Sequence, residues 1–357
     1  MNPFIAIMVF FAALGLFDMM LGGKLGLKDE FENGLATMGG LSVSVAGFYS
    51  VGVSFVQNNA EAIAKATAGL PFDPSLIIGS LLAPDMGAFA VALRLARTPD
   101  IAVFTGALVA GGIGMTIGYQ LPVFLASVRQ DEIDPLLRGF IAGLITFPAG
   151  ALIGGLILGL SPSDLFRNMI PALLICVLLS LAVKFLPKIT MKVLTVFGNF
   201  IRIVSYLFFG MAVVGMFLPS HALVDPALVE EILYMVVRMV IVACGGMVLS
   251  KIVLTKYPDK IEAVGKRLGV NNYSVMGIIL SCTQSLAMLP IFSRMDRKGK
   301  VLNAAFSVCG AYVVGGQLAF VSSLTDSHQT AAYIICKLTA GILAIALASV
   351  IPAFSRE

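Results

Sequence analysis

The sequence predicts an all-α polytopic integral membrane protein built from two inverted structural repeats. Of its 357 residues, 58% are hydrophobic and only 12% are charged, which is far more apolar than soluble globular proteins. The apolar runs continue for about 20 residues without the alternation of barrel strands, so the spans should be helices. Two of these runs, in different halves of the chain, carry a polar interruption at the same place.

The two interrupted runs are the clearest indication of function. Leu76–Ala96 is broken by Ala83-Pro84-Asp85-Met86-Gly87, and Met276–Met295 is broken by Ser281-Cys282-Thr283-Gln284-Ser285. Proline removes a helix hydrogen bond and a carboxylate is costly in hydrocarbon, so neither break should face lipid. Interrupted segments at matching positions of two halves are typical of a transporter's binding site.

The duplication extends beyond the breaks. Glu61-Ala62-Ile63-Ala64-Lys65 recurs as Glu262-Ala263-Val264-Gly265-Lys266, and Gly118-Tyr119-Gln120-Leu121 recurs as Gly315-Gly316-Gln317-Leu318. Each match is weak alone, but their shared order and spacing predict an internal repeat.

Uninterrupted spans are expected, in chain order, near residues 3–21, 35–57, 101–127, 136–160, 167–186, 191–218, 230–254, 301–324 and 330–353. The first has no basic residue ahead of it, and we expect a retained helix rather than a cleaved signal peptide. A short amphipathic stretch, Asn58–Leu70 or Tyr257–Leu268, precedes each broken run and should lie at the membrane interface.

Charge placement indicates how the second broken run meets the membrane. If the lysines between residues 184 and 192 are cytoplasmic and residues 276–293 enter and leave on one side, the basic loop Arg294–Lys300 is cytoplasmic too. The positive-inside rule therefore favours a re-entrant hairpin. Charge does not decide between a crossing and a hairpin for residues 76–96. A hairpin would place the basic residues Arg94 and Arg97 outside the cell, against the positive-inside rule.

With both broken runs re-entrant, one linker helix inverts the second repeat relative to the first. The single transmembrane domain, residues 1–357, then consists of repeat 1 (1–165), a linker helix (166–189) and repeat 2 (190–357). We expect a multi-pass protein of a bacterial plasma membrane with a cytoplasmic C-terminus.

The composition argues against other function classes. The five cysteines lie in apolar runs at irregular spacing and predict neither disulfides nor a metal site. With no Gly-rich phosphate loop, nucleophile elbow or metal-ligand cluster, we expect no enzyme activity, no cofactor and no bound metal. The net charge of +4 fits basic cytoplasmic loops and does not indicate nucleic acid. Membrane lipid is an expected partner, and a homo-oligomer is left open.

Asp85 is the first candidate for contact with a substrate. Its carboxylate, at a hairpin tip, would suit an ammonium group or Na⁺, although after Pro84 it could instead cap the second half-helix. Thr283, Gln284 and Ser285 offer neutral hydrogen-bonding groups at the matching break.

Further polar residues lie inside the apolar runs. Gln120 and Gln317 occupy equivalent places beside glycines, where a buried amide needs partners in either a substrate or a neighbouring helix. The ionisable residues within apolar runs are Asp18, Arg202, Arg238 and Lys337. Such residues usually pair or line a water-filled path. Arg238, two turns from Glu231, is compatible with pairing or snorkelling, and we expect Lys337 to snorkel near the end of its span, while contact of each with a substrate stays an alternative.

At these residues the sequence resembles the ethanolamine permeases encoded in ethanolamine-utilisation operons. The segments that carry the resemblance are Phe31-Glu32-Asn33-Gly34, Met38-Gly39, Leu82-Ala83-Pro84-Asp85-Met86-Gly87, Val270-Asn271-Asn272, Met295-Asp296-Arg297-Lys298-Gly299-Lys300-Val301, Gly315–Phe320 and Lys337-Leu338. The Asp-Met-Gly break and the basic Met-Asp loop are the most specific of them. The resemblance implies uptake of a small polar amine between the two broken helices.

The sequence departs from this family where the substrate should bind. Gln284-Ser285 stand where the family typically has paired asparagines, and Gly316-Gln317 stand where it has an Asp-His pair. Asp85 is thus the carboxylate that remains. The resemblance implies that Asp85 pairs with the ammonium group, while Gln120, Gln284, Ser285 and Gln317 contact the hydroxyl end.

Other interpretations stay open. A carrier of a small anionic or zwitterionic metabolite would use Arg202 or Arg238 to receive a carboxylate, so the direction in which these arginines point separates the two. Coupling to Na⁺ or to protons and passive facilitation are equally compatible with these residues.

The charge argument predicts the topology of the basic loop. Cysteines placed at Lys260 and Lys298 should react with a membrane-impermeant thiol reagent from the same side, because residues 276–293 form a hairpin. The measurement compares labelling in intact cells and in inside-out vesicles. Labelling of the two positions from opposite sides would contradict both the hairpin and the inverted repeat.

Overall fold

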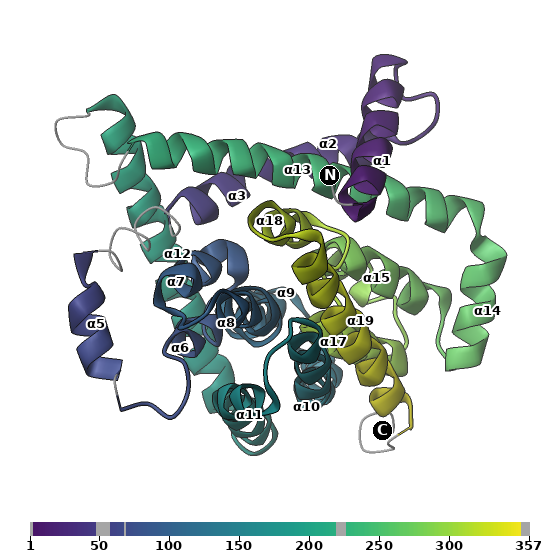
Figure 1. The fold of residues 1–357 in the computed structure, drawn as a ribbon. Coiled ribbons are helices and arrows are strands. Elements are labelled where there is room, and N and C mark those ends of the chain that lie inside the picture. The colour runs from purple at the N-terminus through teal and green to yellow at the C-terminus, as the bar shows by residue number, and fades with distance from the viewer. Residues whose placement is uncertain (1–2, 48–57, 68, 219–225, 351–357) are drawn as a thin grey trace.

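The computed structural model describes residues 3–47, 58–67, 69–218 and 226–350, and these ranges contain helices, turns and loops but no strand (Figure 1). Seven described helices are long and apolar enough to cross a membrane: Pro3–Met20, Pro99–Ser127, Gln130–Ile157, Pro162–Phe185, Pro187–Phe217, Val229–Lys256 and Ser327–Val350. The expected all-α polytopic fold is confirmed.

The first half of the chain contains α1 (Pro3–Met20), α2 (Lys28–Ala36), α3 (Met38–Leu41), α5 (Ala60–Thr67), α6 (Ser75–Gly79), α7 (Ala88–Leu95), α8 (Pro99–Val103), α9 (Leu121–Ser127) and α10 (Ile133–Ile157). The linker helix is α11 (Pro162–Phe185). The second half contains α12 (Pro187–Phe217), α13 (Pro226–Lys256), α14 (Pro258–Leu268), α15 (Asn272–Thr283), α16 (Leu289–Phe292), α17 (Arg297–Cys309), α18 (Gly316–Leu324) and α19 (Ser327–Val350).

The first broken run is a hairpin closed at its base by Asp73, which is 1% exposed. Its Oδ1 accepts hydrogen bonds from the backbone and hydroxyl of Ser75, at 3.0 and 2.6 Å, and its Oδ2 accepts one from the backbone of Arg97 at 2.9 Å. Ser75 begins α6 and Arg97 follows α7, so the two ends of the run meet. The run therefore turns back, a point that loop charges could not decide.

The second broken run is also a hairpin, as the charges predicted. Asp296, just after it, accepts hydrogen bonds from the backbone of Asn271 at 2.9 Å and from the hydroxyl of Ser274 at 3.0 Å. Both partners lie at the start of α15. In addition, Lys298 Nζ donates to the carbonyl of Leu268, the last residue of α14, at 2.7 Å. The basic loop thus lies beside the amphipathic helix.

The two halves share an order of elements. The amphipathic helices α5 and α14 lie at opposite edges of the molecule (Figure 1), and each is followed by a hairpin and two longer segments. The first of these segments differs between the halves. Residues 99–127 are continuous and mostly π-helical, from Phe104 to Gly114 and from Thr116 to Gln120, whereas α17 and α18 are separate helices.

The expectation of one continuous helix over residues 301–324 was therefore wrong. Between α17 and α18 the chain pairs with the second hairpin, because Tyr312 N donates to Ser281 O and Val314 N donates to Cys282 O, both at 3.0 Å. At Gly315 a Cβ atom would lie 1.9 Å from the carbonyl oxygen of Thr283, so only glycine fits there. Of the expected span at residues 35–57, residues 48–57 lie outside the described part of the chain.

The core of the bundle is α10, which packs against α17 and α19. Its glycines allow backbone contact: a Cβ at Gly139 would lie 2.4 Å from the carbonyl oxygen of Val301, and one at Gly150 would lie 2.4 Å from that of Cys336. Small residues at such positions let membrane helices approach closely.

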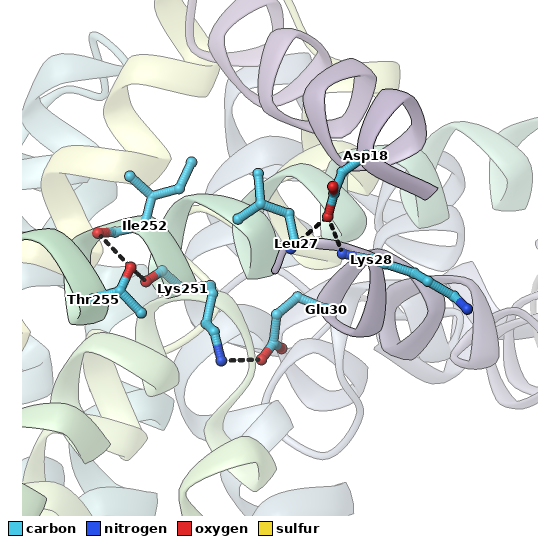
Figure 2. A network of polar contacts seen from close by, with 7 residues as sticks. All are labelled: Asp18, Leu27, Lys28, Glu30, Lys251, Ile252 and Thr255. Atoms are coloured by element: carbon cyan, nitrogen blue, oxygen red, sulfur yellow. Dashed lines mark hydrogen bonds and ion pairs between the residues drawn. The ribbon is translucent and has the colours of Figure 1, made fainter. Parts of the chain in front are cut away.

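Asp18 anchors the N-terminal corner rather than facing a cavity. It is 0% exposed, and its carboxylate accepts hydrogen bonds from the backbone of Leu25, Leu27 and Lys28 at 2.6 to 2.9 Å. These N–H groups precede or begin α2, where an anion is favoured (Figure 2). Glu30 of the same helix pairs with Lys251 of α13 at 3.8 Å. The ionisable residue in the first span thus has a structural role.

The hairpin base predicts a sharp effect on stability. Asp73→Ala leaves the buried backbone N–H of Ser75 without its acceptor and should lower the free energy of unfolding by about 2–4 kcal/mol. Titration of the purified protein with SDS in mixed micelles measures this. Asp131→Ala, which removes an exposed carboxylate paired with Arg129, is the matched control and should change stability by less than about 0.5 kcal/mol. Equal effects of the two changes would contradict the role of Asp73.

Candidate functional site

A cavity of about 710 Å³ lies between the tips of the two hairpins. One wall comes from the broken segments and the neighbouring helices, and the other comes from α2, α3, α12 and α13. Its charged and larger polar lining residues are Asp85, Tyr119, Asn199, Arg202, Tyr206, Gln284, Tyr312 and Gln317. Residues from both breaks line this one cavity, whose surface is more apolar than polar.

Asp85 lies at the tip of the first hairpin, in a single 3-10 turn, Pro84–Met86. Pro84 sets the start of the turn, and Gly87, with φ of 91°, ends it in a left-handed conformation that favours glycine. The N-cap of α7 is Gly87, with no side-chain cap, so the alternative that Asp85 caps this half-helix is wrong. Its Oδ1 is buried and has no hydrogen-bond partner.

Gln317, in the first turn of α18, has an unpaired donor where Asp85 has an unpaired acceptor. It is 3% exposed, and its Oε1 accepts a hydrogen bond from the hydroxyl of Tyr333 at 2.8 Å. Its Nε2 is buried without a partner. Among the described side chains that have a buried unpaired polar atom, Asp85 and Gln317 are the ones that line the cavity. The site therefore holds one unpaired acceptor and one unpaired donor.

Gln120 and Ser285 lie behind the cavity wall rather than in it. Gln120 Nε2 donates to Ser285 Oγ at 3.0 Å and to the carbonyl of Ser307 at 2.9 Å. Ser285 Oγ in turn shares a 2.8 Å hydrogen bond with the hydroxyl of Tyr312. The two predicted residues thus join the halves of the chain and hold a tyrosine that does line the cavity.

The remaining residues predicted at the second break, Thr283 and Gln284, line the cavity. Thr283 Oγ1 shares a 3.0 Å hydrogen bond with Ser250 Oγ of α13, which ties the hairpin tip to the opposite wall. Gln284 is half-buried and extended between α15 and the 3-10 turn that follows.

Tyr312 is a lining residue that the site prediction did not include. With φ of 64°, it is the described non-glycine residue that adopts a left-handed backbone, which is rare for a bulky side chain and occurs mainly at functional sites. The signal in the sequence is the run of glycines around it, Gly310, Gly315 and Gly316.

The three basic residues of the apolar runs have different surroundings in the structure. Arg202 lines the cavity but is exposed. Arg238 is exposed outside the lining, with its guanidinium 6.0 Å from the ring centre of Tyr234, and it forms no ion pair with Glu231. Lys337 does not snorkel, contrary to expectation. It is 4% exposed because α19 packs against α10 and α17 along this stretch.

The donor set of the site fits an organic cation better than a resident metal. In the part of the chain that the structure describes, no group of three or more His, Cys, Asp or Glu side chains could hold a metal ion. A single carboxylate facing a neutral amide can instead accept from an ammonium group and donate to a hydroxyl oxygen.

Comparisons with known proteins agree with this chemistry. The probable ethanolamine permease EutH of Listeria monocytogenes is 31% identical over 343 residues, covering 96% of this chain and 92% of the relative. The uncharacterized protein YxeR of Bacillus subtilis is 29% identical, and the probable ethanolamine permease EutH of Salmonella typhimurium is 28% identical, each over 96% of this chain and over 92% and 93% of the relative. No solved structure matches the chain. The sequence profile of the family described as "Ethanolamine utilisation protein, EutH" matches residues 2–351, and the chain therefore belongs to the EutH family.

Proposed function

We propose that this protein is a secondary transporter that carries ethanolamine or a similar small amino alcohol, which binds in the cavity between the two hairpin tips. The observation that carries the proposal is that two residues lining that cavity each keep a buried, unpaired polar atom, Asp85 at Oδ1 and Gln317 at Nε2. Buried polar atoms are normally paired, so an unpaired acceptor and an unpaired donor in one cavity match a ligand with both groups. Family relatives named as ethanolamine permeases support the same substrate and a transporter rather than an enzyme.

Asp85 supplies the countercharge for the ammonium group. An ammonium that leaves water for a membrane interior loses hydration worth several kcal/mol unless an opposite charge compensates it. Asp85 Oδ1 has no hydrogen-bond partner among the described residues, so the lone pairs of this oxygen remain available. The substrate then makes the interaction that the empty site lacks.

Gln317 recognises the hydroxyl end. Because Tyr333 donates to Oε1, Nε2 is the unpaired donor of this lining residue, and we expect it to donate to the hydroxyl oxygen. Thr283 and Gln284 complete the polar wall, while Gln120 and Ser285 act through Tyr312. The two tips therefore hold opposite ends of one small molecule.

We infer an inverted repeat and alternating access from the direction of the helices. Asp134 at the start of α10 pairs with Arg297 at the start of α17 at 2.6 Å, so these helices begin at the same end. Residues 99–127 lead into α10 through a tight connection and run opposite to it, and hence opposite to α17. Equivalent segments that run in opposite directions support inversion, with a cytoplasmic C-terminus in a bacterial plasma membrane.

One observation favours a second candidate function. Arg202 lines the same cavity and could receive a carboxylate, which would suit a small zwitterion or anion. Arg238 gives no such support, because it lies outside the lining. Arg202 is exposed and therefore screened by water, so we prefer the cation carrier.

Asp85→Asn is expected to lower uptake of radiolabelled ethanolamine into proteoliposomes at least about 100-fold, because a neutral amide cannot balance an ammonium. Folding should stay close to normal, since Asp85 makes no hydrogen bond that the change would remove. Gel filtration in detergent provides the control for folding. Wild-type rates in Asp85→Asn would place the ammonium elsewhere, and inhibition of uptake by carboxylates instead of amines would favour the Arg202 carrier.

Gln317→Met tests recognition of the hydroxyl group. Loss of one hydrogen bond should reduce the preference for ethanolamine over ethylamine up to about tenfold, measured by competition against labelled ethanolamine. Tyr333 keeps a second acceptor in the carbonyl of Tyr312, at 3.4 Å, so the change leaves its hydroxyl paired. Gln284→Asn is the matched control and should mainly shift selectivity among amino alcohols. An unchanged preference in Gln317→Met would exclude its role.

A further inference from the structure

The ammonium group of Lys337 is buried next to the cavity wall. Its Nζ donates to the carbonyl of Gly111 at 2.8 Å and to that of Cys309 at 3.4 Å. Gly111 belongs to the π-helical segment of the first half, and Cys309 is the last residue of α17. Terminal carbonyls of a helix have no partner within it and carry partial negative charge, so they suit a cation. The lysine is thus held where segments of both halves meet.

The same glycine connects Lys337 to the substrate cavity. A Cβ built on Gly111 would lie 3.2 Å from Gln317 Oε1, 3.3 Å from the ring of Tyr333 and 3.7 Å from the side chain of Lys337. Gln317 lines the cavity together with Asp85. Lys337 therefore lies one side chain behind the wall of the cavity that Asp85 also lines.

Lys337 and Asp85 differ in their hydrogen-bond partners. Lys337 forms no ion pair with any described carboxylate, but two carbonyls hold it. Asp85 Oδ1, by contrast, has no hydrogen-bond partner among the described residues. Lys337 is also the only lysine or arginine buried in the described part of the chain; Arg202 at the cavity is exposed. When the site is empty, Lys337 is the nearby buried charge opposite in sign to Asp85.

We propose that Lys337 is the resident countercharge of the empty transporter, which balances Asp85 until a substrate ammonium replaces it. This inference rests on the proposed function. The two carbonyls hold Lys337 in both states, and in the loaded state the substrate pairs with Asp85. In the empty state Lys337 compensates a carboxylate that would otherwise face the dry interior alone, so the empty site can reorient across the membrane.

If Lys337 has this role, removal of its charge should affect net uptake and exchange differently. Net uptake requires the empty site to return across the membrane in every cycle, whereas exchange of internal for external substrate uses only the loaded site. Removal of the charge at residue 337 should therefore slow net uptake and spare exchange. A purely structural lysine would affect both modes alike.

The test uses Lys337→Gln, which keeps a hydrogen-bond donor for Gly111 O and removes the charge, in proteoliposomes with radiolabelled ethanolamine. Relative to wild type, net uptake should fall at least about tenfold, while exchange into vesicles preloaded with unlabelled ethanolamine should stay within about threefold. Lys337→Arg keeps the charge and should restore net uptake. The exchange measurement also shows that each variant is folded.

Other outcomes would overturn the inference. Equal net uptake in Lys337→Gln and wild type would show that Asp85 needs no resident countercharge. A parallel loss of net uptake and exchange would show that Lys337 supports only the structure. Wild-type protein that carries no ethanolamine in either mode would instead refute the proposed function, and this inference with it.

Discussion

A chain that enters and leaves a membrane on one side must satisfy the free backbone groups at the point where it turns in, and here an aspartate does so in each half. Asp73 joins the two ends of the first hairpin, and Asp296 joins those of the second. Because these carboxylates close the bases, the tips are held at a defined depth. The positions of Asp85 at the first tip and of Thr283 and Gln284 at the second depend on these two contacts.

The two tips are related in sequence but not in chemistry. The first presents a carboxylate, and the second presents neutral groups from Thr283 and Gln284. The equivalent glutamines have also diverged, since Gln120 is fully paired inside the wall and Gln317 keeps a free donor. A duplicated scaffold with unlike tips suits a substrate whose two ends differ. A symmetric cavity would hold such a molecule in two orientations equally well.

Much of this arrangement could be predicted from local chemistry. Pro84 next to Asp85, and the polar run from Ser281 to Ser285, cannot lie in a lipid-facing helix, so both breaks were identified correctly. The break at Gly310–Gly315 was not, because Val313 and Val314 keep the stretch apolar, and only pairing with Ser281 and Cys282 reveals it. The burial of Lys337 likewise depends on which helices pack against α19. The hydropathy of the sequence does not show which helices are neighbours. The two halves share an order of elements, as a repeat would require, while the repeat and its inversion stay predictions.

The glycine face of α10 has a consequence for how such a molecule can move. At Gly139 and Gly143 a Cβ would collide with α17, and at Gly150 with α19, so these contacts leave little room for the helices to slide. These helices therefore favour motion as one rigid body that carries the hairpin tips, while α2, α3, α12 and α13 form the opposite wall of the cavity. Rearrangement would then occur at the interface lined by Tyr119, Arg202 and Met247. We expect bulky substitutions at this interface to trap the protein in one conformation.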